Sequence, residues 1–595
     1  MAAVATRELQ TTIPGTEKVT LVSCKVLIDG QELDPAIPIL KITIEKEVNR
    51  IPAAILTIPD GDVSLQDFPV SNKQLFKPGN KVEIQLGYET KTETVFKGIV
   101  VAHGSRISRL SSQLVVTCRD TAIQMTLARR NAAFYEMTDS DIASQLIGQY
   151  SGLTADVEST DIKHLQLLQC NLSDWDFILG RFDVLGMCCT VEDGKISIKK
   201  PDLKQDRKFD VVYGATLIDY QANIDARTQS SGAEASSWDY SAQALNNGAG
   251  ADPSVNAAGN LGAADLAGVM AFESETFAFP GKWSEAELKA LADARLTKRR
   301  LAAIKGNVRF QGTNKIHPNE FITIGGIGDR FSGPVYVSAV KHVFEGGDWL
   351  TTVNFGLDPV WFAEKINPWH PVAAQGIMPV TQGLYNGVVT DIEDPENEFR
   401  VRVKIPVIDA KGEGVWARIA TLDAGNNRGT FFRPELNDEV VVGFMGTDMR
   451  DAVILGMLHS SSLAAPLTPA KDNYQKGYVS KTNFKLIFDD EKKSLTIESP
   501  KGKKITVSDE DKVLQLEDEN GNKIILDEKG ITLKTDKDLL LDVGGKFNLK
   551  AGGDAGVEAM NLALKGSSKA AIEGAQVEVK GSGQTTIKGG LVNIN

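Results

Sequence analysis

Four short segments near the C-terminus decide the fold of this chain: Ile531-Thr532-Leu533-Lys534, Phe547-Asn548-Leu549-Lys550, Val577-Glu578-Val579-Lys580 and Leu591-Val592-Asn593-Ile594. Each has the length and alternating polarity of a strand that buries one side and exposes the other. Gly, Asp, Asn and Ser lie between the segments and favour tight turns. The sequence therefore predicts a region of short strands with one apolar face.

The central apolar residues of this region recur every seven or eight residues. They are Leu533, Leu541, Leu549, Val557, Leu564, Ile572, Val579, Ile587 and Ile594. Such a regular period disfavours a disordered tail and is typical of repeats that must stack to bury their apolar sides. Each strand is too short for one chain to enclose a core. We therefore expect a triangular prism over residues 478–595, in which three identical chains each supply one face.

Length and composition limit the possible functions. At 595 residues the chain has room for several domains, and 42% hydrophobic with 24% charged residues is ordinary for a globular protein. A net charge of −13 without a long Lys/Arg block disfavours nucleic acid as a partner. No apolar run approaches the roughly 20 residues that span a bilayer. Residues 1–20 lack a hydrophobic signal core, so we expect assembly in the cytoplasm without a signal peptide.

Residues that often carry chemistry do not form recognisable sites. The five cysteines lack metal or disulfide-framework spacing and are expected as buried thiols: Cys24, Cys118, Cys170, Cys188 and Cys189. The six histidines also lack metal spacing: His103, His164, His317, His342, His370 and His459. Residues 325–328, Gly-Gly-Ile-Gly, precede no helix start and predict a turn rather than a phosphate loop. We expect no catalytic, cofactor or metal site.

Strand and helix patterns predict a mainly β protein in six parts. These are a first hub β-barrel (1–125), a helical or mixed hub segment (126–200), a second, related hub β-barrel (201–370), an OB-fold domain (371–460), a linker (461–477) and the trimeric prism (478–595). Three helices are expected, at Thr138–Tyr150, Ser173–Leu185 and Ser284–Leu301, because capping residues open each apolar stripe. Residues 228–269 are rich in Gly, Ala, Ser and Asn and predict an exposed insertion.

The OB prediction rests on five alternating strands within about 80 residues, which suit a small Greek-key barrel. OB folds often bind oligonucleotides through aromatic residues over a basic groove. Here the strands carry no such pair, and one loop is acidic through Asp391, Glu393, Asp394, Glu396 and Glu398. Nucleic-acid binding is therefore not expected.

Four motifs in this order give the chain a resemblance to the VgrG family. They are SDWDFIL at 173–179, RFSGPVYV at 330–337, LNDEVVVGF at 436–444 and DAVILGMLH at 451–459. The last two resemble the OB-domain signature of that family and the first two its hub elements. VgrG proteins are the spikes of type VI secretion systems and are similar to the fused hub and spike of contractile phage tails. Extracellular injection particles carry similar spikes, and the motifs do not separate these classes.

The resemblance implies a homotrimer at the tip of a contractile injection apparatus. The hub would cap an inner tube of hexameric rings within the baseplate, and the prism would pierce the target membrane to deliver effectors outside the producing cell. A PAAR-type cap would dock on the tip residues Leu591, Val592, Asn593, Ile594 and Asn595.

Two other functions fit parts of the sequence. A cell-wall hydrolase carried on the spike would cleave glycans, but residues 460–477 are too short to hold an inserted enzyme domain. A trimeric adhesive tail fibre can also end in a β-prism, but fibres generally finish in a receptor-binding head with exposed aromatics, whereas this sequence finishes in a strand. We therefore expect a piercing protein without enzymatic activity.

Overall fold

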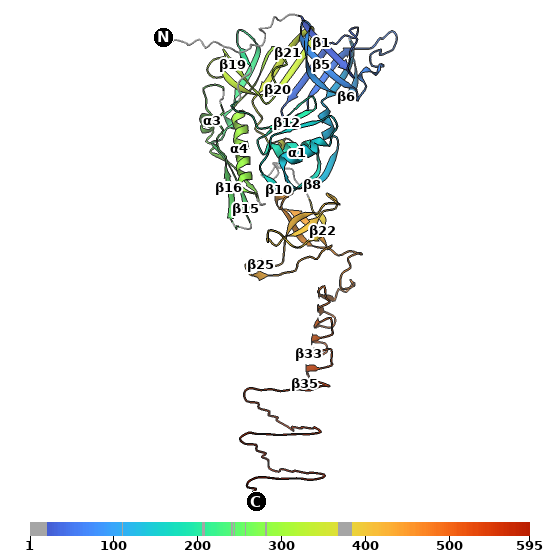
Figure 1. Cartoon of the computed structure of the whole chain (residues 1–595), viewed down its shortest axis with the longest axis vertical. Coiled ribbons are helices and arrows are strands. Elements are labelled where there is room, and N and C mark those ends of the chain that lie inside the picture. Colours follow the sequence, from blue (N-terminus) through green and yellow to red (C-terminus); the bar gives the residue numbers. More distant parts are fainter. Residues whose placement is uncertain are drawn as a thin grey trace. The chain divides into compact units, whose positions relative to one another are not determined.

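A computed structural model describes residues 21–109, 111–204, 209–239, 242, 244–255, 258–279, 283–366 and 383–594. The chain divides into two units, Met1–Ala464 and Ala465–Asn595. Figure 1 shows the elements of each unit. His370, Asn595 and the predicted domain boundaries at residues 1, 370 and 371 lie outside the described residues.

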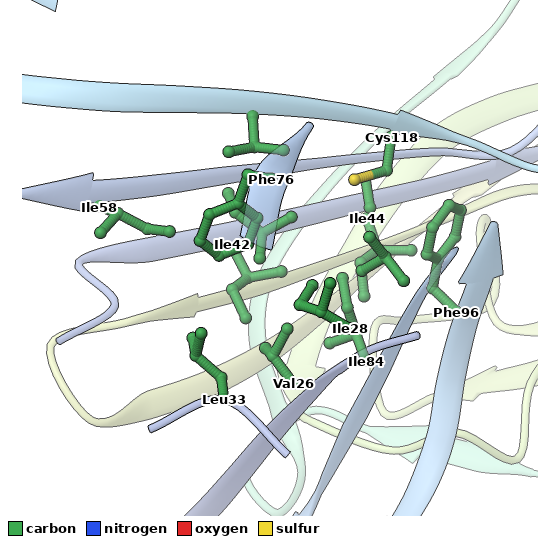
Figure 2. Close-up of a cluster of buried hydrophobic side chains, with 14 of the residues drawn as sticks. Val26, Ile28, Leu33, Ile42, Ile44, Ile58, Phe76, Ile84, Phe96 and Cys118 are labelled. Atoms are coloured by element: carbon green, nitrogen blue, oxygen red, sulfur yellow. The ribbon is translucent and has the colours of Figure 1, made fainter. Parts of the chain in front are cut away.

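The first hub region is a sheet wrapped around its own apolar core. Its strands are β1 (Val22–Ile28), β2 (Gln31–Glu32), β3 (Lys41–Glu47), β4 (Ala53–Pro59), β5 (Lys81–Tyr88), β6 (Lys91–Ile107) and β7 (Ser112–Arg119). Alternation places Ile42 and Ile44 of β3 inside and their neighbours outside. Figure 2 shows these side chains facing Ile84 of β5 and Phe76, which belongs to the short helix η1 (Gln74–Phe76).

The second hub region repeats this arrangement around a separate core that includes Val308, Phe310 and Val353. Its strands are β13 (Asp210–Val212), β14 (Leu217–Ile224), β18 (Ile304–Gln311), β19 (Phe321–Gly325), β20 (Gly333–Glu345) and β21 (Asp348–Phe355). The two regions expected as barrels are continuous with each other, because β20 pairs antiparallel with β3, with His342 opposite Ile44. The result is one 13-stranded sheet with two cores.

In the sequence, two helices and several short strands separate the two hub regions. The strands are β8 (Arg129–Thr138), β9 (Thr154–Val157), β10 (Lys163–Ser173), β11 (Cys188–Glu192) and β12 (Lys195–Lys199), with a short helix η2 (Thr121–Thr126). Helix α1 (Asp139–Gly148) begins at a capping box formed by Thr138 and Asp141. Helix α2 (Asp174–Asp183) begins after Ser173, whose hydroxyl accepts from the Asp176 N–H. Both predicted helices are confirmed to within about a turn.

The described residues of the segment 228–269 form strands and a helix of the hub, which corrects the expectation of an exposed insertion. They contribute β15 (Gly232–Asp239), β16 (Ala244–Ala249) and α3 (Ala263–Val269), which follow η3 (Ala226–Thr228) and precede β17 (Ser274–Phe279). Figure 1 shows β15 and β16 alongside α4 (Glu285–Leu301), the third predicted helix. A Cβ at Gly248 would lie 2.5 Å from the Leu288 carbonyl carbon, and one at Gly250 would lie 2.7 Å from the Ala292 oxygen. Gly248 and Gly250 therefore allow the backbone to pack closely against α4.

The OB prediction is confirmed by a closed five-stranded barrel. Its strands are β22 (Tyr385–Asp391), β23 (Val401–Lys404), β24 (Val415–Ile419), β27 (Glu439–Phe444) and β28 (Ala452–Met457). A two-stranded arm of β25 (Ala424–Gly425) and β26 (Arg428–Gly429) extends from it (Figure 1). The helix α5 (Phe362–Ile366) precedes the barrel in sequence, and η5 (Met445–Thr447) joins β27 to β28.

The second unit contains one antiparallel meander in which every strand pairs with its neighbours in sequence. Its seven strands are β29 (Gln475–Val479), β30 (Lys485–Asp489), β31 (Ser494–Glu498), β32 (Lys504–Ser508), β33 (Val513–Glu517), β34 (Lys523–Asp527) and β35 (Gly530–Lys534). Residues 535–594 continue without an assigned strand (Figure 1). Among the described helices, none has the length and apolar character needed to cross a membrane.

Candidate assembly surfaces

The meander has one apolar face, which its own chain leaves uncovered. Register places two columns of side chains on this face. One column is Tyr478, Leu486, Ile497, Ile505, Leu516, Ile524 and Leu533; the other is Phe488, Leu495, Val507, Leu514, Leu526 and Ile531. The first column lines a groove in this unit. An exposed apolar surface of this extent marks an interaction site.

The opposite face of the meander is mostly polar, although Ile487, Val513 and Ile525 also lie on it. Thr506 and Gln515 stand opposite each other at its centre, and Lys523 Nζ lies 2.7 Å from Glu517 Oε1. A further pair joins Lys485 and Glu498 at 3.6 Å. The sheet is therefore amphipathic, with solvated charges on one side and unpartnered aliphatic side chains on the other.

The recurring apolar residues beyond the meander are exposed on the surface of the single chain. Leu541, Leu549, Val557, Leu564 and Ile572 are each more than half exposed, as are the later members of the series. The three later segments that predicted strands have no hydrogen-bonded neighbour strand within the described chain. A strand is stable only beside a neighbour, which agrees with the lack of assigned strands in these segments.

The predicted tip residues lie in this same region. Leu591, Val592, Asn593 and Ile594 are exposed, and Leu591 and Ile594 are more than four-fifths accessible. Asn595 lies outside the described residues. Docking of a cap on these residues stays a prediction.

The OB barrel is joined to the hub through β10. Leu168 and Cys170 of this strand belong to the apolar core of the barrel. Gln166 accepts a hydrogen bond from the Trp416 N–H at 2.6 Å and donates to the Trp416 carbonyl at 3.1 Å. Its amide also donates to the Arg450 carbonyl at 3.1 Å. A hub strand therefore packs against the closed barrel and hydrogen-bonds to it.

A buried ionic cluster reinforces this junction. The Arg450 guanidinium contacts Glu287 at the start of α4 and lies 2.8 Å from Asp448 Oδ2. Its carbon sits 4.4 Å from the centre of the Trp283 ring, a cation–π contact. Burial disfavours ionised Glu287 and Asp448, but Arg450 lowers the pKa of both carboxyl groups below their ordinary values. One cation thus pairs with two carboxylates, one from the hub and one from the barrel.

The cluster continues into the hub. His164 Nδ1 lies 4.0 Å from Glu287 Oε1, and His164 Nε2 lies 2.8 Å from Asp139 Oδ2. Arg181 Nε donates to Asp139 Oδ1 at 2.7 Å. Burial opposes ionised Asp139, yet Arg181 and His164 lower the pKa of this carboxyl. Residues from α1, β10, α2 and α4 are thereby tied to the OB domain.

Sequence patterns did not reveal this cluster, whereas the acidic loop and the glycine turn were both visible in them. The acidic OB loop folds on itself: Asp394 accepts from the backbone N–H groups of Glu396, Glu398 and Arg400 and pairs with the Arg400 side chain at 2.8 Å. Gly326 has a φ of 77° in the predicted glycine turn, and no helix follows it.

The last turn of helix α4 contains three consecutive basic residues, which are buried and form ion pairs. Lys298, Arg299 and Arg300 contact Asp183, Glu275 and Asp252, respectively. The cysteines are free thiols, four of them buried and Cys24 half-buried. Burial raises the pKa of Cys118 to about 12, so this thiol stays protonated and unreactive.

Comparison with solved structures shows a fold similar to that of the PdpA–VgrG complexes. The half-lidded and lidded Francisella PdpA–VgrG complexes match with TM-scores of 0.52 and 0.51, each at 10% identity and over 86% of this chain, covering 88% and 80% of theirs. The E. coli c3393 protein, a type VI secretion component, matches with a TM-score of 0.45 and 13% identity over 73% of this chain and 100% of its own. The predicted VgrG-like fold is confirmed.

Two family models match the chain, and one of them describes the OB domain. Residues 385–459 match the type VI secretion system/phage-baseplate injector OB domain, which coincides with the closed barrel. No curated protein matches the chain. Residues 18–345 match the Alg8 N-terminal domain, a match that spans more than half of the sequence. The chain therefore belongs to the Alg8 N-terminal domain family.

Proposed function

We propose that this protein is the homotrimeric hub and spike of a contractile injection apparatus. One observation carries the proposal: the meander over residues 475–534 has two continuous columns of exposed aliphatic and aromatic side chains. Three such faces packed together would form a shared core, with the polar faces outward. The VgrG-like fold and the injector OB-domain match support the same role.

In this role the Met1–Ala464 unit would sit on the end of the inner tube, within the baseplate. Each chain brings two sheet regions with separate cores, so three chains would present six similar regions to a hexameric ring. A cap of the PAAR type would bind the tip, and effectors would travel with the particle. These partners follow from the resemblance to VgrG proteins.

The geometry of the meander suits a shaft that pierces an envelope. Its strands stack at about 4.8 Å, with hydrogen bonds running along the stacking direction. In a trimeric shaft, a load along the axis would be shared by many of these bonds. Separation of the chains would expose the apolar columns to water, which is unfavourable.

The oligomeric state tests the proposal directly. Light scattering on the purified chain should give a mass of about three times 64.3 kDa. Truncation at Thr468 removes the entire amphipathic sheet and should weaken the trimer. A full-length protein of one-chain mass would overturn the proposal. A truncated protein that remains fully trimeric would show that the hub supplies the assembly energy.

We further propose that the chain acts without hydrolase activity of its own. The barrel ends at Met457 and the meander begins at Gln475, so the connecting residues are too few for an inserted enzyme domain. A zymogram on purified peptidoglycan, with hen lysozyme as the positive control, should show no lytic band for this protein. A band at its position would contradict the proposal.

A further inference from the structure

Two stretches of strand edge in the 13-stranded hub sheet are covered by no described strand. β14 stands at one end of the strand order and pairs only with β18. In the first hub region, β6 pairs with β5 only as far as Ile99, so residues 102–107, the free half of β6, pair with β7 alone. Alternate N–H and C=O groups of an uncovered edge point away from the sheet, where they can bond to another strand.

The two hub regions match each other closely around the free half of β6. Gly79 and Asn319 both have positive φ, 102° and 71°, in the turns before β5 and β19. Their N–H groups donate to the carbonyls of Val100 in β6 and Val337 in β20, at 2.8 and 2.9 Å. A bulge directly follows each of these two valines. β20 therefore occupies in the second region the place that β6 occupies in the first.

The strand β14 corresponds in the same way to β3. β3 lies beside β4, which pairs with β7, and β14 lies beside β18, which pairs with β21. Tyr220 and Ala222 of β14 pack against the core of the second region as Ile42 and Ile44 of β3 do in the first. Each region thus contains the same four strands in the same order, β3-β4-β7-β6 and β14-β18-β21-β20.

Within one chain, two of these matching edges are already joined. β20 of the second region pairs antiparallel with β3 of the first. Two ion pairs of 2.7 Å cross this junction, Lys41 with Glu345 and Lys341 with Glu45. The counterparts of these two strands are β6 and β14, the strands with uncovered edges. The junction inside the chain is therefore a template for a second junction between chains.

We infer that β14 of one chain pairs antiparallel with the free half of β6 of a neighbouring copy, in the register of the β20–β3 junction. This inference rests on the trimer proposed above. The two edges are different surfaces of one hub, so the contact is head-to-tail, and such contacts close into a ring when the rotation fits. A second copy is the favoured occupant because the hub itself already contains the matching pair of strands.

The side chains that this register brings together are compatible. Arg106 would lie opposite Gln221 and diagonal to Asp219, so that unlike charges approach each other. Ile107 is 68% exposed in the single chain and would lie opposite Tyr220, where part of its apolar surface is removed from water. None of the facing pairs in residues 102–107 and 220–225 combines two like charges.

Cysteine cross-linking in the full chain tests the pairing. Arg106→Cys with Gln221→Cys places two thiols opposite each other in the inferred register, at a separation that a disulfide can bridge. In one chain these positions lie seven strand spacings apart along the sheet, about 34 Å, so a disulfide between them joins two chains. After oxidation we expect more than half of the protein in bands of two and three chains on a denaturing gel without reductant. Reduction should return it to one band.

Two matched variants control for the oxidation conditions and for the register. Thr43→Cys with Val343→Cys is the equivalent pair of the junction inside the chain, and should lose its two free thiols while running as one chain. Arg106→Cys with Ile218→Cys moves one thiol three residues along β14, about 10 Å, and should stay at one chain. Single-cysteine variants control for the native thiols, four of which are buried.

The possible outcomes separate this inference from the proposed function. The inference is overturned if the protein is trimeric by light scattering and the Thr43/Val343 pair oxidises, but the Arg106/Gln221 pair gives no band of two or three chains. Equal cross-linking with Ile218 also overturns it. Both results leave the proposed function standing. A one-chain mass for the unmodified protein overturns both.

Discussion

Aspartate at both Ile505 and Leu516 should leave the protein as single chains. These residues face each other across β32 and β33 on the apolar face, so a trimer would bring six carboxylates into its core. Burial of each aliphatic side chain is worth about 1.5–3 kcal/mol, and the variant loses this gain in every chain. An isolated carboxylate in an apolar core adds a larger cost. Light scattering should fall from three chain masses to one.

The matched control changes the same two strands on the other face. Thr506→Asp with Gln515→Asp introduces the same number of charges at a facing pair that the proposed trimer leaves in water. This variant should keep the trimer mass. If both variants stayed trimeric, the apolar face would not be the assembly surface. If both dissociated, added charge rather than the face would be the cause.

Replacement of Arg450 by methionine should lower the free energy of unfolding of the Met1–Ala464 unit by about 3–5 kcal/mol. The guanidinium is buried between Glu287 and Asp448, and its loss leaves two carboxylates without a cation. Chemical denaturation followed by tryptophan fluorescence measures the change, since Trp283 lies against Arg450. Arg50→Met is the control: Arg50 is exposed and pairs with Glu47 at 3.2 Å, so its loss should cost less than about 1 kcal/mol.

The pH dependence of the unfolding free energy of the unmodified protein and of Arg450→Met separates the loss of charge pairing from the loss of packing. With Arg450 present, the lowered pKa values of Glu287 and Asp448 stabilise the fold above the unfolded values of about 4, and this stabilisation is lost as pH falls. Without Arg450, burial raises both pKa values, so the carboxyl groups destabilise the fold at neutral pH and less so as pH falls. The difference in unfolding free energy between the two proteins should therefore become smaller as the pH falls from about 7 to 5. A constant gap would point to packing alone.

Local sequence signals predicted the three longer helices and the strand at Ile531–Lys534, while the trimeric prism stays a prediction. The period of seven or eight residues was visible because the alternation of apolar and polar residues lies within each short segment. The segment Ile531–Lys534 forms most of β35. Helices α1, α2 and α4 begin at the predicted caps Thr138, Ser173 and Ser284, since a cap and its acceptor lie within one turn.

Long-range packing explains what the sequence did not reveal. Gly248 and Gly250 read as an exposed insertion because their composition is typical of loops, and only the approach of α4 explains them. The continuity of the two hub regions depends on the β3–β20 pairing, which joins residues some 300 positions apart.

The ionic cluster is also non-local. Asp139, His164, Arg181, Glu287 and Arg450 come from distant parts of the sequence. Each is an ordinary charged residue in its local context, so periodicity and spacing give no sign of it.

The change at Lys534 from self-paired strands to unpaired chain has a kinetic consequence. Strands β29–β35 each close a loop of a few residues, so this sheet can form early within one chain. The described residues after Lys534 pair with no strand of their own chain. In the trimer that we propose, folding would then nucleate at the base and zip toward the tip, and the first sheets would set the relative stagger of the chains for the whole needle.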